Sequence, residues 1–369
     1  MIKLLIVDDS ALMRRQLAAV FEAEPGFEVR LARNGREAVE ENRAFRPDVV
    51  TLDINMPEMD GLSALSLIMV ERPVPVVMVS SLTEKGALAT FEALNLGAVD
   101  YVAKPGGTIS LSIDSIRETL ISKVRGASRA RLKPARKPLA KLPDTNKKST
   151  QSATAPAAEQ PITQRPPRRS VAGIGSVGSD GIVLIGVSTG GPRTLESILP
   201  LLPIGFPWPV LVAQHMPASL TPAFAQRMND LCPLQVVEAS RPTVLEPGTI
   251  YIGKGGADMI VVERSGKTMV IAKPESKDVL WHPSVELLGR SALEHYDPAK
   301  ILGVMLTGMG YDGADAFTEI RSRGGRTIAE SEESSVVFGM PAELISRGGA
   351  TVTLHADRIA LQINAWIGC

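Results

Sequence analysis

The sequence contains few cysteines, few aromatic residues and no long apolar run. Two cysteines, Cys232 and Cys369, are too few for a disulfide framework and lack metal-ligand spacing, which is typical of a reducing cytosol. The start, "MIKLLIVDDSALMRR", has an apolar core of only five residues, which is too short for a signal peptide. No uninterrupted apolar stretch approaches the roughly 20 residues that a membrane-spanning helix needs. We therefore expect a cytoplasmic protein without membrane insertion.

An excess of either charge sign is also lacking. The 40 basic and 40 acidic side chains cancel, so the net charge does not point to a polyanionic partner. At 369 residues the chain is long for one domain, and we expect two domains joined by a connecting segment.

Residues 121–179 differ in composition from the rest of the chain. From 121 to 170 there are thirteen Lys or Arg, two acids, seven Pro and no aromatic residue. This composition cannot bury enough apolar surface to offset the entropy of ordering. We expect a disordered, basic, proline-rich linker between domains at 1–120 and 180–369. Basic clusters also attract phosphates, but without aromatic stacking residues or a helical pattern we expect no nucleic-acid partner.

Short apolar segments alternate with helix-like segments before the linker. Strands are expected at "KLLIV", "FEVRLA", "DVVTLD", "PVVMVSS" and "AVDYVAK", with helices at Ala11–Ala23, Gly35–Ala44, Gly61–Glu71 and Glu84–Leu96. Continuous apolar strands of this kind suit a parallel sheet that is covered on both faces. The sequence predicts a doubly wound, flavodoxin-like α/β domain with a five-stranded parallel sheet.

The alternation resumes after the linker. Strands are expected at "GIVLIGVS", "PVLVAQHM", "LQVVEAS", "GTIYIGK", "MIVVER", "TMVIAK" and "KILGVMLTG", with helices at Thr194–Leu201 and Ser284–Glu294. The four middle segments are close together in the sequence, so we expect them to form antiparallel hairpins. The prediction is a second α/β domain with a mainly parallel sheet and an antiparallel hairpin insertion.

Chemically active side chains end four of the first five strands. Asp8 and Asp9 follow the first strand, Asp53 the third, Ser80 the fourth and Lys104 the fifth. Carboxyl ends of parallel strands meet at one edge, and close acids repel unless a hard divalent cation such as Mg²⁺ lies among them. Taken singly, strand-end aspartates are more often helix caps. Together these residues indicate phosphoryl transfer to Asp53, with Lys104 holding a phosphoryl oxygen.

"VDDS", "LDINMPEMDG", "VSS" and "YVAKP" resemble the response-regulator receiver family over essentially all of residues 1–120. The resemblance implies that Asp53 is phosphorylated and that Ser80 and Lys104 read the phosphate. It implies that Mg²⁺ is held by Asp8, Asp9, Asp53 and the backbone carbonyl of Asn55.

The run "GIVLIGVSTGGP" raises the question of whether Ser188 is a nucleophile or part of a phosphate loop. A Walker-type loop needs a Gly-Lys-Ser/Thr end, but no lysine lies between Gly181 and Ile204. The glycines here also do not form the dinucleotide pattern G-x-G-x-x-G. Small neighbours expose the serine Oγ, and a following helix start offers N–H groups for an oxyanion. A serine in a glycine turn is more often structural, so a catalytic reading requires a base.

A base and an acid follow two further strands. His215 comes just after "LVAQ" and so lies at the same sheet edge as Ser188, whereas His282, His295 and His355 read as surface or packed histidines. Asp312 lies in the glycine-rich loop of "ILGVMLTGMGYDGAD", where an Asp before Gly is usually turn chemistry. Three strand-end loops with these residue types favour a triad of Ser188, His215 and Asp312.

"GVSTGGP", "QHMP" and "LTGMGYDGA" resemble the catalytic domain of the CheB family of chemotaxis protein-glutamate methylesterases, over roughly residues 180–368. The resemblance implies that Ser188 is the nucleophile, His215 the general base and Asp312 its orienting acid. Thr189 then belongs to the active-site loop, and the backbone N–H of Met309 is an oxyanion donor.

Three positions depart from the family pattern: Val187 replaces the commoner Ala, Tyr311 the commoner Asn, and Glu286 a frequent Asp. None of these changes removes a catalytic group. Tyr311 is bulky enough to reshape the substrate entrance.

The two resemblances together imply a phosphorylation-activated hydrolase. It would demethylate glutamate γ-methyl esters, and deamidate specific glutamines, on chemoreceptor helices, with a chemotaxis histidine kinase as phosphodonor. The receiver would need Mg²⁺ and the catalytic domain no cofactor. The alternative is a receiver-controlled binding protein with an inactive hydrolase-like output domain, against which the intact triad argues.

Overall fold

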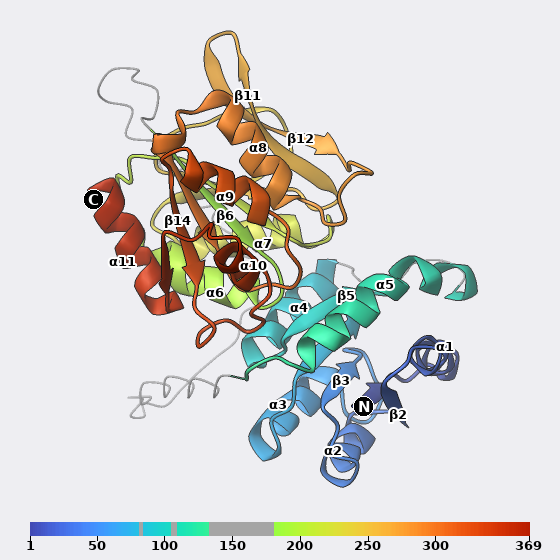
Figure 1. Ribbon diagram of the computed structural model, residues 1–369. Coiled ribbons are helices and arrows are strands. Elements are labelled where there is room, and N and C mark those ends of the chain that lie inside the picture. The colour runs from blue at the N-terminus through green and yellow to red at the C-terminus, as the bar shows by residue number, and fades with distance from the viewer. Residues whose placement is uncertain (81–83, 105–108, 133–180) are drawn as a thin grey trace, which may run out of the picture. The chain divides into compact units, whose positions relative to one another are not determined.

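The computed structural model describes residues 1–80, 84–104, 109–132 and 181–369 (Figure 1). The folded residues on both sides of the segment 133–180 cluster into one compact unit. Most of the expected linker therefore lies outside the described residues. Among the helices of the described ranges, none is long and apolar enough to cross a membrane.

The N-terminal sheet has five parallel strands in the order β2-β1-β3-β4-β5. The strands are β1 (Ile2–Val7), β2 (Phe27–Ala32), β3 (Val49–Leu52), β4 (Val76–Ser80) and β5 (Asp100–Ala103). The chain runs from β1 outward to β2 and then returns to β3 on the other side. The carboxyl ends of β1 and β3 therefore border the crevice at which this topology binds ligands. The predicted five-stranded parallel sheet is confirmed.

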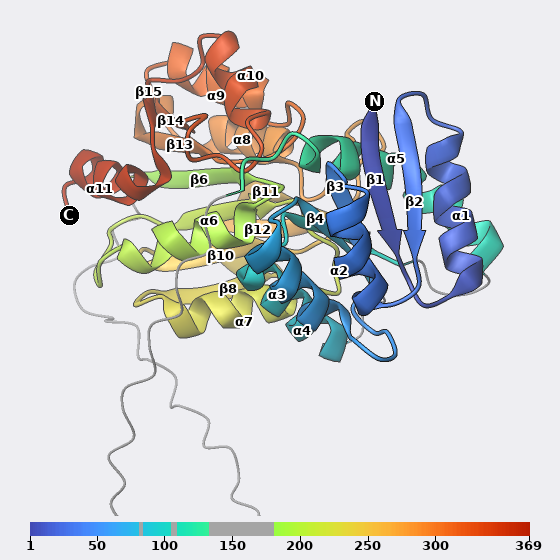
Figure 2. The same ribbon diagram turned by 90° about the horizontal axis from the view of Figure 1, so that it is seen from below.

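Helices cover both faces of this sheet (Figure 2). They are α1 (Ala11–Glu22), α2 (Gly35–Ala44), α3 (Gly61–Glu71), α4 (Glu84–Leu96) and α5 (Ile109–Ala127). Leu4 and Ile6 of β1 pack with α1 and α5, whereas Leu5 and Val7 pack with α2, α3 and α4. This division follows from the two-residue side-chain period of a strand.

Helix α5 continues past residue 120, where the sequence predicts that the linker begins. Leu120, Val124 and Ala127 are fully buried, and their spacing forms one apolar face of the helix. Lys123 and Arg125 lie between these apolar positions, so the basic composition begins inside the helix.

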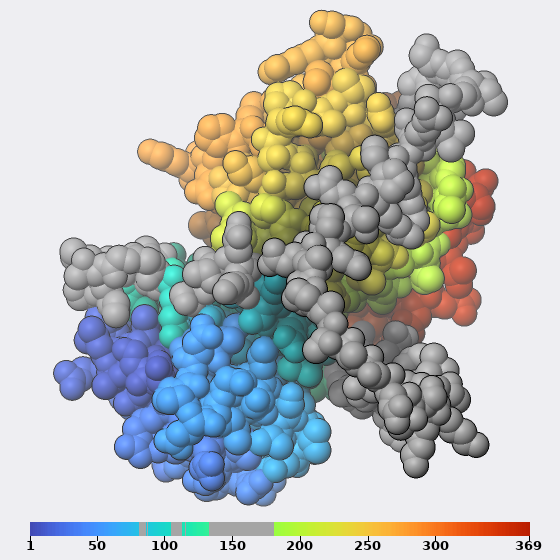
Figure 3. Space-filling view, turned by 180° about the vertical axis from the view of Figure 1, so that it is seen from behind, coloured from blue at the N-terminus to red at the C-terminus, as the bar shows by residue number. Residues whose placement is uncertain are grey.

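The C-terminal domain contains a seven-stranded parallel sheet in the order β15-β14-β13-β6-β7-β10-β8. Its strands are β6 (Ile182–Val187), β7 (Val210–Gln214), β8 (Gln235–Ala239), β10 (Thr249–Gly253), β13 (Ile301–Met305), β14 (Arg326–Glu330) and β15 (Val352–Leu354). A separate antiparallel sheet consists of β9 (Thr243–Val244), β11 (Ala257–Arg264) and β12 (Lys267–Pro274). The hairpin of β11 and β12 stands out from its domain in the space-filling view (Figure 3).

The expectation that all four middle segments form antiparallel hairpins is wrong for β8 and β10. These two strands pair in parallel, with Ile250 opposite Val236, and belong to the large sheet. The short connection between them contains β9, in which Val244 pairs with Met269 of β12. Although this connection is short, it passes through the small sheet, so β10 runs in the same direction as β8.

Six α-helices and two 3₁₀ turns complete this domain. They are α6 (Gly191–Ile198), η1 (Leu199–Leu201), α7 (Thr221–Leu231), α8 (Val285–His295), η2 (Pro298–Lys300), α9 (Ala314–Ser322), α10 (Met340–Ser346) and α11 (Ala356–Ile367). Helices α6, α7 and α11 pack on one face of the large sheet. Helices α8, α9 and α10, together with the small sheet, pack on the other face. Both α/β domains of the predicted fold class are present.

A substitution at Phe317 of α9 tests this packing. Its side chain is fully buried, and a Cβ on Gly303 of β13 would lie 2.9 Å from its ring. Phe317→Ala is expected to lower the free energy of unfolding by about 3–5 kcal/mol, because it leaves a cavity that this close packing cannot fill. Differential scanning calorimetry measures the change in Tm, with Leu361→Ala, at a site that is 59% exposed, as the control. Equal shifts for both variants would contradict this account of the core.

Candidate active site

Three loops meet at the carboxyl edge of the large sheet. Ser188 follows β6, His215 follows β7, and Asp312 lies in the loop between β13 and α9. These strands are parallel neighbours, with β6 between β13 and β7. The chain leaves β6 toward β7 and later returns on the other side as β13, so the loops border the switch point of strand order.

Local hydrogen bonds and two glycines shape the turn at Ser188. The Ser188 N–H donates to the carbonyl of Thr307 at 3.0 Å, which ties this turn to the loop after β13. Gly190 has φ +80°, and a Cβ there would lie 2.6 Å from Val336. Helix α6 begins at the next residue, Gly191, whose N–H donates to the Ser188 carbonyl at 2.9 Å.

His215 and Asp312 form a hydrogen-bonded pair. His215 Nε2 lies 2.8 Å from Asp312 Oδ2, and the two side chains are only 8% and 3% exposed. His215 Nδ1 is buried without a hydrogen-bond partner. Within the described ranges, no hydrogen bond joins Ser188 to His215. The structure brings His215 and Asp312 of the expected triad into contact, and the other ring nitrogen of His215 makes no hydrogen bond.

The start of helix α8 holds the Asp312 carboxylate. Oδ2 accepts a hydrogen bond from the Val285 N–H at 2.7 Å, and Oδ1 accepts from the Ser284 hydroxyl and the Glu286 N–H, each at 3.0 Å. Burial raises the pKa of Asp312, but the His215 contact and the helix N–H groups outweigh burial and hold it below its ordinary value. Asp312 is therefore an ionised acceptor in contact with His215 Nε2.

The sequence does not predict two residues that touch this pair. Ser284 also accepts from the Leu287 N–H as the N-cap of α8, and a serine before a helical pattern is a signal for this role. Trp281 stacks on His215, with ring centroids 5.8 Å apart and planes inclined by 4°. No local sequence pattern marks Trp281, because this contact joins distant segments.

Two residues of the active-site loops contact the N-terminal domain within the same compact unit. The buried Thr189 hydroxyl donates to Asp100 Oδ2 of β5. Asp100 Oδ1 in turn lies 2.8 Å from Nζ of Lys123 on α5. Met309 Sδ lies 3.5 Å from Ser122 Oγ, also on α5. These contacts link β5 and α5 to both loops that are expected to hold an oxyanion.

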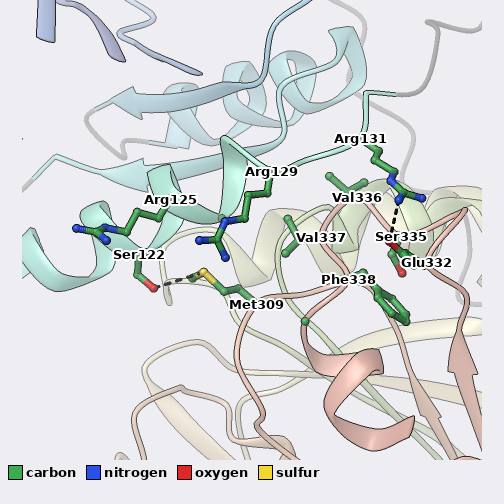
Figure 4. Close-up of a pocket in the computed structure, with 12 residues that line it drawn as sticks. Ser122, Arg125, Arg129, Arg131, Met309, Glu332, Ser335, Val336, Val337 and Phe338 are labelled. Carbon is green, nitrogen blue, oxygen red and sulfur yellow. Dashed lines mark hydrogen bonds and ion pairs between the residues drawn. The ribbon is translucent and has the colours of Figure 1, made fainter. Parts of the chain in front are cut away.

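A separate pocket of about 480 Å³ lies beside Met309 (Figure 4). It is lined by Ser122, Arg125, Gly126, Arg129, Arg131, Met309, Glu332, Ser335, Val336, Val337, Phe338 and Gly339. Arg131 pairs with Glu332 at 2.7 Å across it. Ser188, His215 and Asp312 do not line this pocket, so it is distinct from the triad.

The predicted carboxylate cluster forms at the edge of the N-terminal sheet. Oxygen atoms of Asp8, Asp9 and Asp53 lie within 4.8 Å of one another. Nζ of Lys104 is 2.7 Å from both Asp8 Oδ2 and Asp53 Oδ2. The Ser80 hydroxyl beside them is buried without a hydrogen-bond partner. This oxygen-rich, acidic donor set fits a hard divalent cation such as Mg²⁺.

Electrostatics at this cluster depend on one lysine. Burial raises the pKa of Asp53, while its hydrogen bond and ion pair with Lys104 act in the opposite direction. Burial alone would lower the pKa of Lys104, but its contacts with Asp53 and Asp8 raise it. Asn55, the other expected metal-binding position, is exposed two residues after Asp53, in the loop that follows β3.

Comparisons with known proteins cover both domains. The family model of the CheB methylesterase matches residues 183–363, and that of the response regulator receiver domain matches residues 4–113. A protein-glutamate methylesterase/protein-glutamine glutaminase of Rhodospirillum rubrum is 55% identical over 100% of this chain and 96% of its own length. One of Rhodopseudomonas palustris is 50% identical over 99% and 98%. The crystal structure of the Thermotoga maritima CheB methylesterase catalytic domain matches 51% of this chain and 99% of its own, at 38% identity and TM-score 0.49.

The lowered pKa of Asp312 predicts a pH-dependent contribution to stability. A carboxylate with a lowered pKa stabilises the fold above its unfolded pKa, and this effect is lost as the pH falls through the folded value. The free-energy difference between wild type and Asp312→Asn should therefore shrink as the pH falls from about 5 to about 3. Urea titrations that follow tryptophan fluorescence report this domain, since Trp208, Trp281 and Trp366 all lie in it. A difference that stays constant over this range would contradict the prediction.

Proposed function

Since this chain belongs to the CheB family of receiver-controlled chemotaxis methylesterases and glutaminases, we propose that Ser188 is the nucleophile of its reaction. His215 is the general base, and Asp312 orients His215. The observation that carries this assignment is the 2.8 Å contact between His215 Nε2 and the helix-held Asp312 carboxylate. It leaves Nδ1 as the nitrogen that serves Ser188.

The reaction follows from these roles. His215 Nδ1 takes the proton of Ser188 Oγ as that oxygen bonds to the γ-carbonyl carbon of the substrate. The carbonyl becomes a tetrahedral oxyanion, and the backbone N–H groups of Thr189 and Met309 are its proposed donors. The imidazolium then protonates the leaving group, which departs as methanol from an ester or ammonia from an amide. His215 then deprotonates a water molecule as its oxygen bonds to the acyl carbon. The bond from that carbon to Ser188 Oγ breaks, the imidazolium returns the proton to Oγ, and the γ-carboxylate is released.

In the receiver domain, Asp53 is the proposed phosphoryl acceptor. Asp8, Asp9, Asp53 and the Asn55 carbonyl would hold Mg²⁺, which supplies charge neutralisation during phosphoryl transfer when bound. Lys104 binds a phosphoryl oxygen, and the unpartnered Ser80 hydroxyl is a ready donor to another. Phosphorylation adds negative charge beside Lys104 and so changes the ion pairs that this lysine makes.

The receiver controls the esterase through the active-site loops in this proposal. Asp100 holds the Thr189 hydroxyl, and α5 contacts the side chain of Met309. Both contacts restrain residues whose backbone N–H groups are needed for the oxyanion. Phosphorylation at Asp53 weakens these contacts and frees the loops.

The partners follow from the chemistry of the family. The substrates are methylated or amidated glutamyl side chains on the cytoplasmic helices of methyl-accepting chemoreceptors, and a chemotaxis histidine kinase is the phosphodonor. The protein acts in the cytoplasm, where both partners expose these groups. An inactive, purely binding output domain is disfavoured, because each of the three triad side chains is present.

Methanol release from methylated receptor membranes tests the assignment. Acetyl phosphate with Mg²⁺ is expected to accelerate release by the wild type. Ser188→Ala should abolish release, since the nucleophile is gone, and Asp53→Ala should stay at the basal rate with or without phosphodonor. Release that persists in Ser188→Ala would show that another residue is the nucleophile.

The control contact is tested separately by Asp100→Ala without phosphodonor. A hydrogen bond to a charged group is worth about 1.5–3 kcal/mol, so the basal rate should rise about tenfold or more. Asp114→Ala removes an equal charge from an exposed position of α5 and is the matched control. If a chain without residues 1–132 kept the basal rate of the full chain, restraint by the receiver would be wrong.

A further inference from the structure

Two aromatic side chains continue outward from the ring of His215. Trp281 stacks on the imidazole with centroids 5.8 Å apart, and Tyr311 meets the indole edge to face at 5.2 Å and 87°. His215 is nearly covered, whereas Tyr311 is 52% exposed. We call Trp281 and Tyr311 the aromatic wall, because they form a continuous apolar surface from the catalytic histidine to solvent.

Neighbouring residues hold the wall in place. Gly310 has φ +87°, and a Cβ on it would lie 2.7 Å from the Trp281 ring, so the loop passes directly against the indole. His282, the residue after Trp281, is anchored by the 2.8 Å contact of its Nδ1 with Asp258, a residue that is only 1% exposed. The Arg347 guanidinium lies 5.9 Å from the Tyr311 ring centroid. The wall is therefore a fixed feature of the site.

The wall borders the imidazole that protonates the leaving group in the proposed reaction. Tyr311 sits between Met309, a proposed oxyanion donor, and Asp312 in one short loop. The leaving group takes its proton from His215, so at that step it is within hydrogen-bond reach of the imidazole. The surface that continues from this imidazole toward solvent is Trp281 and then Tyr311.

Resting on the proposed triad, we propose that the aromatic wall makes this enzyme favour γ-methyl esters over primary amides. Both substrates form the same bond, from Ser188 Oγ to the γ-carbon, and release the same γ-carboxylate. They differ in the bond that breaks: C–O, with the proton going to methoxide to give methanol, or C–N, with the proton going to the amide nitrogen to give ammonia.

The two leaving groups interact differently with aromatic carbon. A methyl group loses only apolar hydration when it packs on the rings, which is favourable. An amide NH₂ loses hydrogen bonds to water there, and the rings replace them poorly. In enzyme pockets, one apolar contact of this size changes the ratio of kcat/KM between two substrates by about 10–200-fold. The wall thus sets the balance between the two activities that the family combines.

The test uses the full chain activated with acetyl phosphate and Mg²⁺. The probe is the cytoplasmic fragment of a methyl-accepting chemoreceptor from the same genome, prepared with either a γ-methyl ester or a glutamine at one site. Methanol and ammonia release give kcat/KM for each form. Tyr311→Asn is expected to lower the ester-to-amide ratio about tenfold, since it removes a ring and adds an amide that hydrogen-bonds the NH₂ group.

Three variants separate the wall from general effects. Tyr311→Phe keeps the ring and should keep the ratio. Trp281→Leu should lower the ratio, and should also lower kcat for both substrates because His215 loses its stacking partner. Leu280→Ala, an exposed apolar neighbour at 73%, should change neither rate. Because Tyr311 is half exposed, its variants are expected to fold, and their melting curves check this.

The outcomes distinguish this inference from the proposed function. If Tyr311→Asn and Trp281→Leu change both rates by the same factor, the wall does not select the leaving group and the inference is overturned. If Ser188→Ala still releases either product, the assignment of the nucleophile fails instead. A selective fall in methanol release, with ammonia release kept or raised, supports the wall as the specificity determinant.

Discussion

A buried carboxylate at the start of a helix is the interaction on which the esterase site depends. Asp312 is charged in a nearly inaccessible position, which is unfavourable unless its oxygens accept hydrogen bonds. His215, Ser284 and the first N–H groups of α8 provide those bonds. These N–H groups have no partner within the helix, so the carboxylate and the helix end satisfy each other. The loop after β13, the end of β7 and the start of α8 are thereby held in one arrangement, and the orientation of His215 follows.

In the receiver domain, a lysine side chain rather than backbone N–H groups balances the buried carboxylates. Asp8 and Asp53 are held by the ammonium group of Lys104 at the end of a flexible side chain, whereas backbone donors hold Asp312. A lysine can move to a new oxygen, but the amides of a helix start cannot leave their position. This difference suits the two tasks. In the proposed mechanism, Asp312 keeps its charge and its hydrogen-bond partners in each turnover, whereas Asp53 accepts a phosphoryl group that changes the local charge.

Most of the placements that the sequence predicts correctly follow from the ends of parallel strands. Asp8, Asp53, Ser188, His215 and Asp312 are brought to their sheet edges because parallel strands place their carboxyl ends together. The failures concern contacts that no local pattern encodes. Strands β8 and β10 read as a hairpin because their spacing is short, although pairing with the small sheet turns the chain between them. The stacking of Trp281 on His215 and the bond from Thr189 to Asp100 join residues distant in sequence, and only the folded chain reveals them.

The link between the two sites runs along one short strand. Asp100 is the first residue of β5, and Lys104 follows its last residue, Ala103. The same strand therefore carries the carboxylate that holds Thr189 and the cation that contacts Asp53. A strand rises about 3.3 Å per residue, so β5 spans roughly 13 Å as a single hydrogen-bonded unit. In the proposed control, a change of partner at Lys104 acts through β5 on Asp100, whose Oδ1 forms an ion pair with Lys123 of α5. Because Asp100 accepts a hydrogen bond from Thr189, the residue after the proposed nucleophile, we expect a displacement of this strand to alter the proposed oxyanion site.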